Sequence, residues 1–127
     1  MTQTLTPTTD LSRDQLLNLY REMVKIRQTE EQLVRSVEAG QVPGGCHTYI
    51  GQEAIAVGVE AAIRKTDWVI TTYRDHGFAL TRGTTPGAVM AELYGKDTGC
   101  SRGLGGSMHM FDGPNRFLGG HGIVGGH

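Results

Sequence analysis

The sequence predicts an α/β fold, with helices and short strands alternating along the chain in layers around a parallel sheet. Three stretches, residues 11–40, 52–65 and 85–95, carry apolar residues at helical spacing. The run at residues 67–72 (DWVITT) is rich in β-branched and aromatic residues and is bounded by turn residues, which indicates a strand. One strand does not make a sheet. We therefore expect mostly helices plus a glycine-rich loop within this chain, with the sheet incomplete.

Length and composition bound the possible functions. The 127 residues make at most one domain, which we place at residues 11–127 after a disordered tail at residues 1–10. A net charge of −1 gives no reason to expect a nucleic acid or a membrane as partner. Cys46 and Cys100 lie far apart and outside any zinc motif, which is typical of reduced thiols in a cytoplasmic protein.

The clearest element is the helix at residues 11–40. Ser12 and Gln15 are spaced as in a capping box, and Gly40 is placed to end the helix. The apolar stripe of this helix consists of Leu16, Leu19, Tyr20, Met23, Ile26, Leu33, Val34 and Val37. Glu30 lies within that stripe, and we interpret it as one partner of a partly buried ion pair, with Arg27 or with another segment. A functional carboxylate is the alternative.

The helix at residues 52–65 has almost no polar face, which predicts that it is buried all round. Residues 78–82 predict a brief helix. Thr85 as the N-cap and Pro86 at the first helical position predict the start of another helix, which Gly95 ends.

The glycine-rich tail at residues 99–127 is expected to be an ordered loop shaped around a ligand, because glycine lets a ligand or a second backbone approach closely. A flexible linker is the alternative. Against it, the tail holds apolar residues that a solvated linker would not need: Met108, Met110, Phe111, Phe117, Leu118, Ile123 and Val124.

Polar residues that could do chemistry fall into three groups: His47 in the loop before the second helix, Tyr73, Arg74 and His76 after the strand, and Ser107, His109, His121 and His127 in the tail. Arginine binds phosphate or carboxylate groups, and histidine transfers protons near neutral pH. Together these groups predict an anionic, phosphorylated ligand and acid–base chemistry, although each histidine taken alone also fits a local hydrogen bond. The tail histidines could hold a metal, but their spacing matches no metal motif.

Four motifs occur in order along the chain: G-C-H-T-Y-I-G-Q-E-A at residues 45–54, T-Y-R-D-H-G at 72–77, G-G-S-M-H-M at 105–110 and G-H-G-I-V-G at 120–125. With them the chain resembles the alpha subunit of the thiamine diphosphate-dependent dehydrogenase component of 2-oxo acid dehydrogenase complexes. The resemblance implies the amino-terminal portion of a thiamine diphosphate-binding parallel-sheet fold.

The resemblance also implies roles for particular residues. Tyr73 and Arg74 would bind the diphosphate of the cofactor, and Gly122 and Val124 would contact its aminopyrimidine through backbone groups. His47 would be the catalytic residue that faces the substrate and assists its binding or its proton transfer. In addition, Asp112 would line the same cavity.

The expected partners are a beta subunit, in a heterotetramer with the cofactor between the subunits, and the lipoyl-bearing acyltransferase of the complex. The expected reaction is oxidative decarboxylation of a 2-oxo acid and reductive acylation of a lipoyl group. The family's Mg²⁺ ligands, a G-D-G motif and a later Asn, lie beyond the end of this sequence. We therefore expect an amino-terminal piece of such a subunit, without metal ligands of its own and inactive by itself.

Pyruvate is the expected substrate, because Tyr73, Arg74 and the G-G-S-M-H-M run resemble pyruvate enzymes most. Acetoin-type enzymes tend to have His at the position of Tyr73, and branched-chain-type enzymes lack the G-G-S-M-H-M and G-I-V-G runs. Both types stay as alternatives. A different class also stays open: a non-catalytic binding or interaction module whose glycine-rich tail docks a partner protein.

Overall fold

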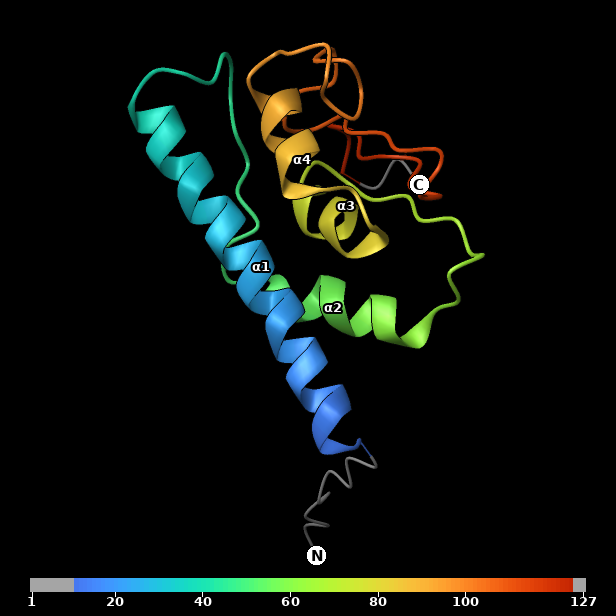
Figure 1. The fold of residues 1–127 in the computed structure, drawn as a ribbon. Helices are drawn as coiled ribbons and strands as arrows, with labels where there is room; N and C mark the ends of the chain where they lie inside the picture. The colour runs from blue at the N-terminus through green and yellow to red at the C-terminus, as the bar shows by residue number, and fades with distance from the viewer. Residues whose placement is uncertain (1–10, 125–127) are drawn as a thin grey trace, which may run out of the picture.

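The computed structural model describes residues 11–124, which form four helices followed by a long glycine-rich segment. The helices are α1 (Arg13–Glu38), α2 (Glu53–Ala62), α3 (His76–Arg82) and α4 (Pro86–Leu93). Helix α1 runs along the whole length of the molecule, and α2, α3 and α4 lie on one side of it (Figure 1). The glycine-rich segment, residues 99–124, packs beside α3 and α4 at the end far from the start of α1.

Helix α1 begins and ends as its sequence predicts. The Ser12 hydroxyl accepts a hydrogen bond from the Gln15 amide at 3.2 Å, and the Gln15 side chain accepts one from the Ser12 amide at 2.8 Å. This is the predicted capping box. At the other end Gly40 has a φ of 69°, a left-handed conformation that glycine adopts without strain and that terminates the helix.

The apolar stripe of α1 is covered in its middle, and Val37 near its end is 38% exposed. Ile26 and Leu33 are buried, whereas Leu16 and Tyr20 near the start are 46% and 61% exposed. Figure 1 shows the reason: the first turns of α1 project beyond the other helices. The described part of the chain therefore covers only the middle of this stripe.

Helix α2 is buried on one face instead of all round. Ala56 and Val57 are buried where α2 packs against α1 and α3. Ile55 and Val59 are 56% and 39% exposed. The prediction of burial all round is wrong here because none of the described segments covers the second face.

The predicted strand at residues 67–72 is reduced to a single parallel bridge between Val69 and Phe117. The Val69 amide donates to the Arg116 carbonyl at 3.0 Å, and the Leu118 amide donates to the Val69 carbonyl at 2.8 Å. A regular parallel ladder would continue from Thr71 to Leu118, but the Thr71 amide donates to the Gly119 carbonyl instead, at 3.0 Å. One extra residue thus breaks the register, and the described residues contain no strand. The parallel sheet is not confirmed.

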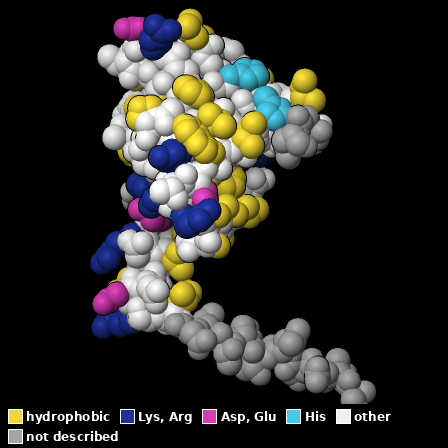
Figure 2. Space-filling view, turned by 90° about the vertical axis from the view of Figure 1, so that its right-hand side faces the viewer, with side chains coloured by type: hydrophobic (Ala, Val, Ile, Leu, Met, Phe, Trp, Pro, Cys, Tyr) yellow, Lys and Arg dark blue, Asp and Glu magenta, His cyan; other side chains and the backbone are white. Residues whose placement is uncertain are grey.

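This pairing still orders side chains as a strand would. Val69 and Phe117 are buried, and their neighbours Trp68, Ile70 and Leu118 are 53%, 56% and 46% exposed on the other side. Figure 2 shows hydrophobic side chains gathered on the face of the molecule that looks to the right in Figure 1.

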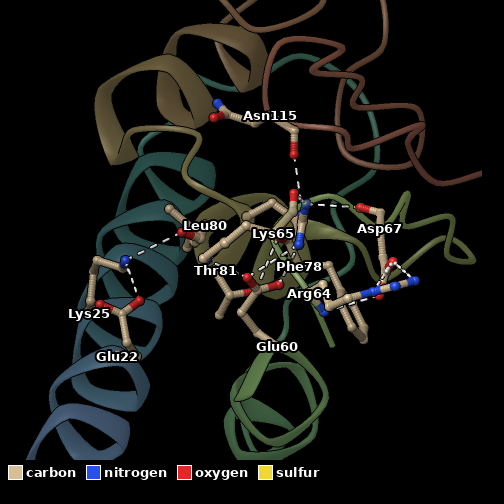
Figure 3. A network of polar contacts seen from close by, with 11 residues as sticks. Glu22, Lys25, Glu60, Arg64, Lys65, Asp67, Phe78, Leu80, Thr81 and Asn115 are labelled. Carbon is tan, nitrogen blue, oxygen red and sulfur yellow. Dashed lines mark hydrogen bonds and ion pairs between the residues drawn. The ribbon is translucent and has the colours of Figure 1, made fainter. Parts of the chain in front are cut away.

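Helix α4 begins at a regular N-cap, and the buried Arg82 at the end of α3 joins this part of the chain to the rest of the fold. The Thr85 hydroxyl accepts from the Ala88 amide at 3.1 Å with Pro86 at the first helical position, as predicted. Arg82 donates to the carbonyls of Lys65, Asp67 and Asn115 at 2.9, 3.0 and 3.2 Å and pairs with Glu60 at 3.1 Å. Figure 3 shows these partners converging from α2, from the turn after it and from the glycine-rich segment.

None of the helices in the described range combines the length and the apolar character needed to cross a membrane. The expected tail at residues 1–10 lies outside the described residues, as does His127.

Candidate functional site

The structure brings three of the predicted site residues together. His47 lies in the loop between α1 and α2, and Tyr73 and Arg74 lie just before α3. The His47 and Tyr73 rings meet edge to face with centroids 5.0 Å apart, and the Arg74 guanidinium carbon lies 5.5 Å from the centre of the Tyr73 ring. Arg74 also donates a hydrogen bond from Nη1 to the Thr48 carbonyl. The three side chains are half-buried, so a ligand can reach them.

Behind His47 lies a buried chain of polar side chains. The Ser107 hydroxyl accepts a hydrogen bond from the His47 amide at 2.9 Å, and it also lies 2.9 Å from His76 Nε2. On the other side of the ring, His76 Nδ1 lies 2.7 Å from a carboxylate oxygen of Glu30. Glu30 and His76 have no exposed surface. The predicted ion pair of Glu30 is therefore confirmed, and its partner comes from another segment, since Arg27 pairs with Glu53 at 2.6 Å.

The surroundings of His76 favour its charged form. Burial works against the charge, but the hydrogen bond from His76 to Glu30 and the negative charge of Glu30 outweigh it and raise the pKa of His76. The positions of the neighbouring atoms act in the same direction, because Nδ1 faces a carboxylate and Nε2 faces the Ser107 carbonyl at 3.1 Å as well as its hydroxyl.

Asp75 connects the start of α3 to the glycine-rich segment. Its Oδ2 accepts hydrogen bonds from the amides of Met110 at 3.2 Å and Gly120 at 3.1 Å. Oδ1 is buried without a hydrogen-bond partner among the described residues. Burial raises the pKa of Asp75 to about 7, although the charge of His76 and the two amides oppose this rise.

Glu92 organises the first part of the glycine-rich segment. Its carboxylate is 1% exposed and accepts four backbone N–H groups. The donors are the amides of Ser101, Gly103, Gly105 and Gly106, at 2.7, 2.8, 2.7 and 3.1 Å. Sequence reasoning missed Glu92 and Asp75. The signal for Glu92 was its position on the inward face of α4, next to the apolar Val89 and Leu93.

The other predicted site residues have surroundings of their own. The Asp112 carboxylate accepts from the Thr84 hydroxyl at 2.7 Å and from the Asn115 side chain at 2.8 Å, so it stabilises a turn. Val124 is 72% exposed.

Two features fit a phosphorylated ligand. Only Nη1 of Arg74 is hydrogen-bonded within the described chain, so the rest of the guanidinium fork is open to an anion. A β-carbon added to Gly122 would meet only His109 Cε1, at 3.9 Å, so the fold itself does not fill the space beside this glycine. A metal site is not formed in this part of the chain. Among the described residues, no three His, Cys, Asp or Glu side chains are grouped so that they could hold an ion.

Comparison with known proteins identifies the class. A family model described as "Dehydrogenase E1 component" matches residues 21–127, and the chain belongs to this family. The family predicted from the four motifs is thereby confirmed.

Individual relatives are more specific. The chain is 48% identical to a protein of Rickettsia typhi over 89% of its own length and 35% of the relative's. It is 50% identical to a protein of Rhizobium meliloti, over 91% of this chain and 33% of the relative. It is 52% identical to a protein of Zymomonas mobilis, over 89% of this chain and 32% of the relative. All three are named "Pyruvate dehydrogenase E1 component subunit alpha". The chain spans about a third of the length of these curated relatives.

Proposed function

We propose that this chain forms part of the alpha subunit of a pyruvate dehydrogenase-type enzyme. The reaction is the oxidative decarboxylation of a 2-oxo acid, with pyruvate as substrate, followed by reductive acylation of a lipoyl group. The observation that carries the proposal is the cluster of His47, Tyr73 and Arg74, because it combines an anion-binding fork with a histidine at one accessible place. The names of the relatives support the same assignment.

The cofactor in this proposal is thiamine diphosphate. When bound, it supplies the nucleophilic carbon that a 2-oxo acid needs in order to lose carbon dioxide. Arg74 and Tyr73 bind the diphosphate, with Arg74 as a bidentate donor. Gly122 and Val124 contact the aminopyrimidine through backbone groups, and Asp112 lines the edge of the cavity from its turn. The Mg²⁺ that accompanies a diphosphate would take its protein ligands from the G-D-G motif and the later Asn that the family resemblance implies.

His47 lies on the substrate side, where its imidazole binds the 2-oxo acid and holds or moves a proton. The partners are a beta subunit, in a heterotetramer, and the lipoyl-bearing acyltransferase of the complex. The free thiols of Cys46 and Cys100 are in keeping with a reducing, cytoplasmic location.

The test uses the full-length gene product, co-expressed with its beta subunit. We expect decarboxylation of pyruvate in the presence of thiamine diphosphate and Mg²⁺, and slower turnover of acetoin and of branched-chain 2-oxo acids. The variant Arg74→Ala should raise the dissociation constant for the cofactor by about one to two decades, because hydrogen bonds to charged groups contribute about 1.5–3 kcal/mol. Arg21→Ala, on the exposed surface of α1, is the matched control.

Unchanged cofactor affinity in the Arg74 variant would remove Arg74 from the site. An assembly that neither binds thiamine diphosphate nor turns over a 2-oxo acid would favour a non-catalytic interaction module.

A further inference from the structure

We propose that the buried chain Glu30–His76–Ser107 positions His47, and that it acts through the backbone of residues 47–49 without touching substrate. This inference rests on the proposed function, because it deepens the role given to His47. The three members come from α1, α3 and the glycine-rich segment, so the loop that carries His47 is held by three separate parts of the fold.

The Ser107 hydroxyl holds the backbone of His47 itself. Its oxygen accepts the His47 amide hydrogen at 2.9 Å and lies 2.9 Å from His76 Nε2. Ser107 thus links His47 to the buried pair of Glu30 and His76, and it does so from a position that is 6% exposed.

Glu30 and Arg74 hold the next two residues. The carboxylate oxygen of Glu30 that does not face His76 accepts the Tyr49 amide hydrogen at 3.1 Å. Arg74 donates to the Thr48 carbonyl. Every residue from 47 to 49 therefore has at least one hydrogen bond to a distant part of the chain, and the His47 side chain leaves this backbone in a defined direction.

The members of this chain are buried and lie within hydrogen-bond distance of one another, at 2.7 Å between Glu30 and His76 and at 2.9 Å between His76 and Ser107. Such a network is rigid, because a side chain that turns away leaves a buried polar group unpaired. A buried charged pair such as Glu30–His76 is also a poor source of stability compared with apolar residues of the same volume. Its place directly behind His47 supports a positioning role.

The test removes the Ser107 hydroxyl in the full-length gene product assembled with its beta subunit. Ser107→Ala leaves the Glu30–His76 pair intact and keeps the Ser107 carbonyl as a partner for Nε2, so the fold is retained. The matched control is Ser101→Ala. Ser101 lies in the same glycine-rich segment, and its hydroxyl likewise accepts a backbone amide hydrogen, that of Phe111 at 2.8 Å, but it does not contact residues 46–49.

The first readout is amide hydrogen exchange of a peptide that covers residues 44–50. We expect Ser107→Ala to speed exchange there by about 10-fold, since the hydrogen bond that holds the His47 amide is lost and its neighbours are loosened. Ser101→Ala should leave this peptide unchanged.

The second readout is a double-mutant cycle on kcat for pyruvate. Ser107→Ala should lower kcat by about 10- to 100-fold when His47 is present, because a misplacement of about 1 Å costs rate on this scale. In a His47→Ala background the same substitution should change kcat less than about 2-fold, since there is no longer a side chain to position. The cofactor dissociation constant should stay within about 2-fold in both backgrounds.

Exchange that stays at the wild-type rate, or a loss of kcat of equal size with and without His47, would overturn the positioning role. These results would not contradict the proposed function, because the activity of the wild-type assembly with pyruvate tests that function separately. A wild-type assembly without 2-oxo acid turnover would overturn the proposed function and the positioning role together.

Discussion

Asp75 and Gly120 approach each other so closely that no side chain fits between them. The Gly120 amide donates to Asp75 Oδ2 at 3.1 Å, and a β-carbon added to Gly120 would lie 2.4 Å from the same oxygen and 2.5 Å from the Thr72 carbonyl. Gly122, two residues further on, has open space beside it. The two glycines of the G-H-G run therefore serve different purposes, and this difference can be measured.

Gly120→Ala should lower the free energy of unfolding by about 1–3 kcal/mol, because the backbone must move away from Asp75 and Thr72. Gly122→Ala should change it by less than about 0.5 kcal/mol but should weaken thiamine diphosphate binding if the cofactor uses this space. Urea unfolding and cofactor titration of the two variants, side by side, give both quantities. Equal loss of stability in the two variants would contradict the different roles given to Gly120 and Gly122.

Glu92→Gln should destabilise the glycine-rich segment. Each carboxylate oxygen accepts two backbone amides, so either orientation of the new side-chain amide places its NH₂ group against two N–H donors. We expect the free energy of unfolding to fall by about 2–4 kcal/mol. Glu31→Gln, on the exposed side of α1, is the matched control and should be neutral. A fully stable Glu92 variant would show that water replaces the lost acceptor.

Asp75→Asn should remove part of the pH dependence of stability. Because the pKa of Asp75 rises from 3.8 to about 7 in the folded chain, the folded state binds more protons than the unfolded state between these values. Its contribution to stability is therefore complete below pH 3.8 and is lost as the pH rises through about 7. The slope is up to about 1.4 kcal/mol per pH unit. Asparagine does not titrate.

The measurement is urea unfolding at pH 5, 6, 7 and 8 for the wild type, Asp75→Asn and the exposed control Asp97→Asn. The stability difference between Asp75→Asn and the wild type should shift in favour of the variant as the pH rises. The slope that remains in the variant belongs largely to His76, whose raised pKa acts in the same direction. A constant difference from pH 5 to 8 would mean that Asp75 keeps an ordinary pKa.

His47→Ala should spare cofactor affinity and lower kcat for pyruvate by about 10²-fold or more, as expected for a positioned proton-transfer group. Steady-state kinetics at saturating cofactor, together with a cofactor titration, check this prediction. Arg21→Ala, on the exposed surface of α1, again serves as the control. A variant with normal kcat and weakened cofactor binding would place His47 at the diphosphate instead.

Interactions within a few residues were predictable from the sequence. The capping box of Ser12 and Gln15, the turn at Gly40, and the start of α4 at Thr85 depend only on side chains and backbone groups three or four residues apart. The four motifs also identified the family, because their order along the chain is a property of the sequence alone. The grouping of His47 with Tyr73 and Arg74 followed from the same resemblance, and the structure brings these three residues together.

Contacts between distant segments were decided only by the tertiary structure. The sequence left the partner of Glu30 open, and the fold selected His76, 46 residues away, at a place where neither side chain meets water. In the folded chain only one face of the apolar helix α2 is covered, and the predicted strand forms a single bridge at Val69. Apolar and β-branched composition reports what a segment can bury or pair with. Whether a neighbour is present to bury it or pair with it depends on how the whole chain packs.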